Sequence, residues 1–162
     1  MNHDIRTILY ACGLGDGCEA PLGYAISLAN RLGARLLVLA VIDEQRERSL
    51  IDLEEHVPQK QLDQYHDERA ARARAHIEAQ IAAFYAVRGS NAPPRPIAEL
   101  IVHEGDDVAQ AILDEAERGS ADLILMASRG AGLLARLLFG SVPQEVLRRT
   151  KRPLLLVPVE AC

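Results

Sequence analysis

The sequence predicts an open α/β fold: a doubly wound sheet of five parallel strands with helices on both faces. Two observations support this. Short apolar runs alternate along the chain with segments of helical periodicity. The first two runs, Ile5–Ala11 and Ala34–Ile42, are continuously apolar, as in strands that helices cover on both sides. Such alternation favours a parallel sheet with right-handed crossovers.

The first half of the chain gives three further elements in order. Apolar residues at helical spacing predict a helix over Pro21–Leu32, which Gly33 would end. A long helix is expected over Gln61–Val87, because this segment is rich in helix-forming residues and has no glycine or proline. The proline-rich stretch 89–96 must break that helix, and the alternation of Ile97–His103 predicts an edge strand.

The second half repeats the pattern. Val108, Ile112 and Ala116 keep helical spacing in a helix that would end near Gly119, and acidic residues before it suit the helix dipole. The remaining elements are a strand over Leu123–Ala127, a helix over Ser141–Arg149 and a strand over Pro153–Val159.

The length and net charge of the chain limit the classes of function that it can have. The 162 residues fit one domain, 1–162, and a net charge of −5 argues against nucleic-acid binding. No apolar stretch approaches the length of a membrane-spanning helix, and no export signal is expected at the start. Three cysteines without a close pair favour a reducing, cytoplasmic location.

Neither the cysteines nor the histidines predict a metal site. Cys12 is interpreted as a buried residue at the end of a strand. His56, His66 and His76 are spaced by ten residues, close to three helical turns, and are interpreted as a solvated helix surface.

The most informative segment is the glycine loop after the fourth strand. Gly130 follows that strand, and Gly140-Ser141 opens the next helix, whose first backbone amides could receive phosphate oxygens. Ser141 and Gln144 also fit a capping box, so Ser141 has a purely structural alternative. Arg129 and Arg136 are candidate phosphate neighbours.

A group of cations near the end of the chain is assigned mainly to structure, because cations at a helix carboxyl end stabilise the dipole without any ligand. These residues are Arg148, Arg149, Lys151 and Arg152.

The loop resembles the universal stress protein family, whose ATP-binding members carry G-x2-G-x9-G-(S/T) after strand four. Here Gly130 and Gly140-Ser141 are in register, and Ala127 stands where the first glycine belongs. The segments ILYACGLGDG, GARLLVLAVID, EGDDVAQAI, SADLILMASRG and RPLLLVP also look like family elements, so the resemblance covers nearly the whole chain.

The resemblance implies strand order 3-2-1-4-5, an adenine nucleotide alpha hydrolase-like fold, and a non-catalytic stress-response or signalling module. It implies ATP, with Mg²⁺ as a candidate companion, and a homodimer through the last strand. Val41 would offer backbone contacts to adenine. The phosphate loop would comprise Ala127, Gly130, Gly140, Ser141 and Val142.

Two departures keep an alternative open. Gly13 stands where the family usually places an aspartate against adenine or ribose, and Ala127 adds a methyl group where the backbone should approach the ligand. Asp16 is a candidate substitute for that aspartate. The alternative is a nucleotide-free dimeric module that acts through protein partners.

Other classes fit less well. The run from Gly13 to Cys18 imitates a dinucleotide fingerprint but lacks the third glycine, and no residues remain for a substrate domain. The sequence contains neither a P-loop nor a G-x-S-x-G elbow, and neither Ser128 nor Ser141 has an evident histidine partner. No catalytic residue is predicted, and hydrolysis of ATP would be slow at most.

Overall fold

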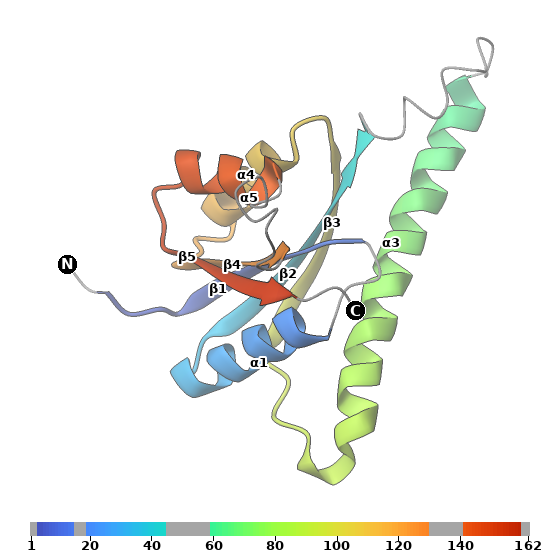
Figure 1. The fold of residues 1–162 in the computed structure, drawn as a ribbon. Helices are drawn as coiled ribbons and strands as arrows, with labels where there is room; N and C mark the ends of the chain where they lie inside the picture. Colours follow the sequence, from blue (N-terminus) through green and yellow to red (C-terminus); the bar gives the residue numbers. More distant parts are fainter. Residues whose placement is uncertain (1–2, 15–18, 45–58, 130–140, 160–162) are drawn as a thin grey trace.

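The computed structural model describes residues 3–14, 19–44, 59–129 and 141–159. They form a five-stranded parallel sheet in the order β3-β2-β1-β4-β5, which confirms the predicted fold class (Figure 1). The strands are β1 (Thr7–Cys12), β2 (Arg35–Asp43), β3 (Ile97–Gly105), β4 (Leu123–Arg129) and β5 (Leu154–Val159). The helices are α1 (Ala20–Leu32), α3 (Gln59–Arg88), α4 (Val108–Arg118) and α5 (Ser141–Arg149), with a 3-10 turn η1 (Gly89–Asn91) after α3.

The predicted elements are all present, and their ends differ by a few residues. β1 begins at Thr7 rather than Ile5, and β4 continues to Arg129, two residues past its predicted end. The helix α1 ends as expected at Gly33, whose φ of 64° is the left-handed conformation that glycine adopts without strain. Sequence patterns fix the existence of elements better than their ends.

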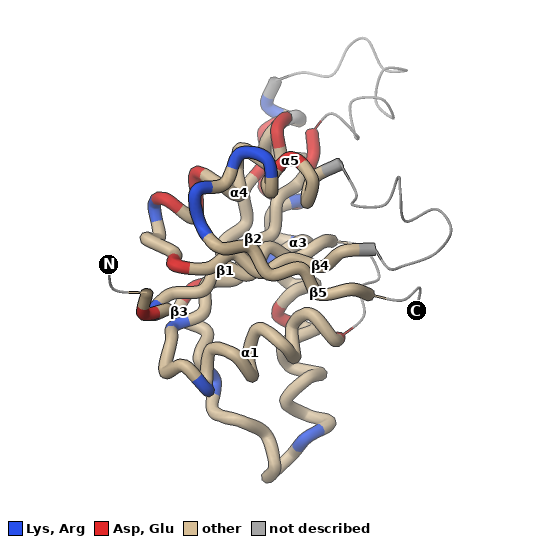
Figure 2. The backbone as a smooth tube through the Cα atoms, turned by 60° about the vertical axis from the view of Figure 1, so that its left-hand side comes forward, with Lys and Arg blue, Asp and Glu red and all other residues tan. Residues whose placement is uncertain are grey.

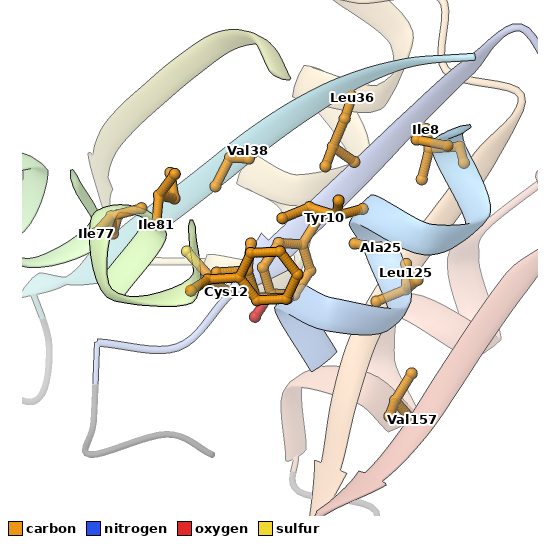
Figure 3. Packing of buried hydrophobic residues seen from close by; sticks show 14 of the residues in the cluster. Ile8, Tyr10, Cys12, Ala25, Leu36, Val38, Ile77, Ile81, Leu125 and Val157 are labelled. Atoms are coloured by element: carbon orange, nitrogen blue, oxygen red, sulfur yellow. The ribbon is translucent and has the colours of Figure 1, made fainter. Parts of the chain in front are cut away.

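Two apolar clusters fill the two faces of the sheet. On one face, α1 and α3 cover β1 and β2, and Figure 3 shows Tyr10 and Cys12 of β1 on the same side as Ile77 and Ile81 of α3. On the other face, α4 and α5 cover a second cluster that includes Val146 of α5, which is fully buried. The central strands β1 and β2 are therefore buried on both faces, as their continuous apolar sequences predict.

Polar contacts tie the strands together at their amino ends. The Asp122 carboxylate, just before β4, accepts hydrogen bonds from the backbone N–H groups of Arg6 and Thr7, each at 2.9 Å. The Arg35 guanidinium donates to the Thr7 hydroxyl and to the Gly119 carbonyl, both at 3.0 Å. This end of the sheet is cross-linked by side chains from three segments that are distant in sequence.

The helix α1 differs in charge from the two helices on the opposite face of the sheet. In Figure 2, basic and acidic positions gather over α4 and α5, whereas α1 is almost entirely uncharged along its length. Within the described part of the chain, no helix is both long and apolar enough to cross a membrane.

Candidate functional site

The strand order reverses next to β1, and this reversal locates the candidate site. The chain proceeds from β1 outward through β2 to β3, then returns to the opposite side of β1 with β4 and continues to β5. In open α/β sheets, ligands bind outside the carboxyl ends of the strands at this switch point. The site is therefore expected where β1 and β4 end side by side.

Three positions singled out in the sequence lie within one residue of the same level of the sheet here. Cys12 pairs with Ala40 in β2, so the next residues, Gly13 and Val41, follow together. Ala11 pairs with Met126 in β4, so Ala127 follows beside Cys12. Val41 of β2 and Gly13, directly after β1, are therefore level, and Ala127 of β4 lies one residue nearer the amino ends.

Gly13 is a solvent-exposed position directly after β1. Apart from its chain neighbours, no atom of the described residues lies within 4 Å of a Cβ built on it. Its backbone is not in the positive-φ region. Within the part of the chain that the structure describes, neither space nor backbone conformation therefore requires glycine at this position.

Directly beneath Gly13, β1 is buried. The Cys12 thiol donates to the Leu39 carbonyl at 3.2 Å, and burial raises the pKa of the thiol to about 12. Burial also raises the pKa of the neighbouring Tyr10 phenol. Cys12 is a free, buried thiol, as the sequence predicted, and its protonated state at neutral pH leaves it without nucleophilic chemistry.

The phosphate side of the predicted site is described only in part. Val142 in the first turn of α5 and Val41 in β2 both pack against the apolar cluster beneath α4 and α5. Ser141 begins α5, but its side chain lies outside the described part, as does that of Arg129. Gly130, Gly140, Arg136 and Asp16 also lie outside the described residues.

The cations near the end of the chain have structural partners. Arg149 of α5 donates to Asp107, which caps α4 by accepting from the Gln110 N–H at 2.9 Å. The hydrogen bond from the Arg149 guanidinium lowers the pKa of the Asp107 carboxyl.

Two neighbouring arginines are paired as well. Arg148 pairs with Glu145 at 2.6 Å, and Arg152 pairs with Glu117 at 2.5 Å. The structural interpretation is confirmed for all three arginines, whereas Lys151 is exposed and stays a prediction.

One interaction escaped the sequence pattern. His66 of α3 lies 2.8 Å from Glu104 of β3, measured from Nδ1 to Oε2. The ten-residue spacing of the histidines indicated a helix surface but gave no sign of a partner on β3. Within the described ranges, no group of three or more histidine, cysteine or acidic residues is placed to hold a metal.

A groove of about 660 Å³ lies elsewhere, between the outer face of α1 and the carboxyl end of α3. Its walls include Tyr24, Phe84 and Arg88. The Arg88 guanidinium stacks on the Phe84 ring at 3.6 Å and pairs with Glu19 at 2.5 Å. No strand end borders the groove, so it is separate from the switch-point site.

Similarity to known proteins identifies the family of this chain. A model of the universal stress protein family matches residues 4–158. The chain belongs to the universal stress protein family. The stress response protein NhaX of Bacillus subtilis (strain 168) is 37% identical over 59 residues, which are 36% of this chain and 35% of that protein. The match thus spans about a third of that relative's length.

Solved universal stress proteins share the fold. UspA from Lactobacillus plantarum is similar with a TM-score of 0.65 and 23% identity, over 96% of this chain and 99% of that one. A universal stress protein in complex with cAMP is similar with a TM-score of 0.56 and 18% identity, over 96% of this chain and 98% of that one. The universal stress protein from Archaeoglobus fulgidus in complex with dAMP is similar with a TM-score of 0.50 and 14% identity, over 94% of this chain and 96% of that one.

Proposed function

We propose that this universal stress protein binds an adenine nucleotide, ATP with Mg²⁺, at the carboxyl ends of β1, β2 and β4. The observation that carries the proposal is the register of the strands, which brings Val41, Gly13 and Ala127 within one residue of the same level beside the switch point. Ala127 lies near the end of the strand that leads into Gly130, Gly140 and Ser141. The three strand ends and the glycine loop would therefore surround one ligand.

The chemistry of this edge suits such a ligand. Backbone groups at the end of β2 can meet the polar edge of adenine, and the free amides at the start of α5 suit phosphate oxygens. Two relatives of the same fold were solved with cAMP and dAMP, which are both adenine nucleotides. Both support an adenine ligand, and the choice of ATP rests on the register of the glycine loop.

The proposed role is a stress-response or signalling module in the cytoplasm rather than a catalyst. Switching would come from nucleotide occupancy, with ATP hydrolysis slow at most. Cys12, a free and buried thiol, is compatible with a reducing compartment.

The test is the shift in unfolding temperature of nucleotide-stripped protein with millimolar ATP and Mg²⁺, with GTP and NAD as controls. Ligand at about a hundred times its dissociation constant should stabilise the fold by about 2.7 kcal/mol, enough for several degrees. Gly140→Asp, which places a negative charge in the glycine loop, should abolish the shift. The matched variant Gly13→Ala should retain it.

A dimer through β5 is part of the proposal. β5 is an edge strand, bonded to β4 on one side, and Leu155 remains 37% exposed. An apolar edge of this kind favours pairing with a second copy. Light scattering should give twice the 17.7 kDa chain mass. Leu155→Lys should shift the mass toward one chain, whereas Val87→Lys, at an 80% exposed position on α3, should not.

A second function is favoured by the two departures at the site. Compared with the family pattern, Gly13 lacks a carboxylate and Ala127 has an additional methyl group at the proposed site. A nucleotide-free dimer that acts through protein partners would tolerate both. It predicts no thermal shift with any nucleotide while the dimer persists.

A further inference from the structure

The two halves of α3 are held to the sheet in different ways. The carboxyl half inserts Ala73, Ile77, Ile81 and Phe84 into the core. Among residues 60–72, no side chain that the structure describes is buried, and only His66, Arg69 and Ala70 are partly covered. The described side chains of the amino half therefore bury little apolar area, which is typical of the low-stability part of a fold.

His66 provides a specific contact from this half to the sheet. Its Nδ1 lies 2.8 Å from Oε2 of Glu104, and the side chains are 41% and 20% exposed. The Tyr65 ring stands edge-on to the imidazole, with ring centroids 6.4 Å apart. Glu104 pairs in register with Ile42, so the contact lies at the carboxyl ends of β2 and β3.

We infer that His66 and Glu104 form a pH-sensitive clasp that holds the amino half of α3 on the carboxyl ends of β2 and β3. An imidazole ordinarily gains its proton between pH 8 and 5, whereas a glutamate keeps its negative charge down to about pH 4.3. Between these limits the neutral hydrogen bond becomes a charge-assisted one, which is roughly twice as strong. The clasp is tight at mildly acidic pH and loosens as pH rises.

The surrounding charges do not oppose this change. α3 packs against β3 and β2, which end in Glu104-Gly105 and Asp43 at this corner. The other titratable and charged groups in residues 60–72 of α3 and around these two strand ends are Asp43, Glu44, Lys60, Asp63, Tyr65, Asp67, Glu68, Arg69, Arg72, His103 and Asp106. Carboxylates predominate among them, so an added positive charge on His66 meets a negative field.

The clasp does not rest on the nucleotide proposal, because neither residue belongs to the proposed nucleotide site. Its consequence is mechanical. When the clasp loosens, the amino half of α3 is free to move away from the carboxyl end of β3.

The test is amide hydrogen exchange of the full chain at pH 6 and pH 8, corrected for the intrinsic pH dependence of exchange. Amides of residues 60–72 should be about two- to fivefold more protected at pH 6, as expected for a partly exposed ion pair. His66→Gln and Glu104→Gln should bring this ratio to one. His76→Gln is the matched control, because the side chain of His76 contacts Gln80 on its own helix, and this substitution should leave the ratio unchanged.

Amides of residues 77–84 report whether each variant keeps its core and serve as the internal reference. A protection ratio of one in the wild type would overturn the clasp. So would a ratio that survives in both His66→Gln and Glu104→Gln while the core amides stay protected.

Discussion

The two ends of the sheet are built differently. At the amino ends, the Asp122 carboxylate and the Arg35 guanidinium join the segments before β1, β2 and β4. At the carboxyl ends, β1 stops at a buried cysteine followed by an exposed glycine, whose Cβ position has no atom of the described residues within 4 Å apart from its chain neighbours. Stability is concentrated at one end and access at the other, which is the division that ligand binding at strand ends requires.

The largest expected effect concerns the reactivity of Cys12, which tests whether β1 is closed to solvent directly below Gly13. Because burial raises the pKa of its thiol to about 12, its thiolate fraction at pH 8 should lie about a thousandfold below that of an exposed thiol. Alkylation of the native protein, with labelled peptides identified by mass spectrometry, should leave Cys12 unmodified until denaturant is added. Rapid labelling of Cys12 in the native state would show that the carboxyl end of β1 is open below Gly13.

The amino-end ties should matter most for folding. Asp122→Ala removes the acceptor of two backbone N–H groups and should lower the free energy of unfolding by about 2 to 3 kcal/mol. Asp122→Asn keeps an acceptor oxygen and should cost less. Urea denaturation measures both variants, and equal, negligible losses would mean that these ties do not stabilise the amino end.

The carboxyl end should respond in affinity rather than in stability. Gly13→Asp restores the carboxylate that the family resemblance places against adenine or ribose, and the open space accommodates it. ATP affinity by calorimetry should rise about tenfold to a hundredfold, while the apoprotein changes by less than about 0.5 kcal/mol. Gly13→Ala, which adds bulk without charge, should not raise affinity. An equal gain in both variants would contradict a role for the carboxylate.

The smallest effect is expected where α4 meets α5. Arg149 lowers the pKa of Asp107, so the ionised carboxylate stabilises the fold above its ordinary pKa of 3.8, and this stabilisation is lost as pH falls through the lowered value. Asp107→Asn keeps the helix cap but removes the charge. Its deficit in unfolding temperature should be present at pH 7 and vanish in acid. Asp67→Asn, on the exposed surface of α3, is the matched control and should show no such pattern.

The fold could be predicted from the sequence because its strands are buried on both faces. Continuous apolar runs such as Ala34–Ile42 leave little ambiguity, and Gly33 marks the helix end with a conformation that few other residues adopt. Strand ends were less predictable, because they depend on partners elsewhere. β1 starts at Thr7, where Asp122, more than a hundred residues away, takes up the backbone donors.

The candidate site was predictable in position but not in detail. Val41 and Ala127 were identified from the family pattern, and the sheet register places Val41 level with Gly13 and Ala127 beside Cys12. The contact of His66 with Glu104 left no trace in the sequence, because the two residues are 38 positions apart and meet only when α3 packs on β3. Periodicity identifies the face of a helix but not the strand that the face will meet.

The most direct test of the account is to map the nucleotide contact by backbone amide chemical shifts as ATP and Mg²⁺ are added. The account predicts large changes at Gly13, Val41 and Ala127, and none at Thr7 or Asp122. Changes confined to the amino ends, or to the groove between α1 and α3, would contradict the proposed site. No change at saturating ATP, with the dimer intact, would favour the partner-binding module instead.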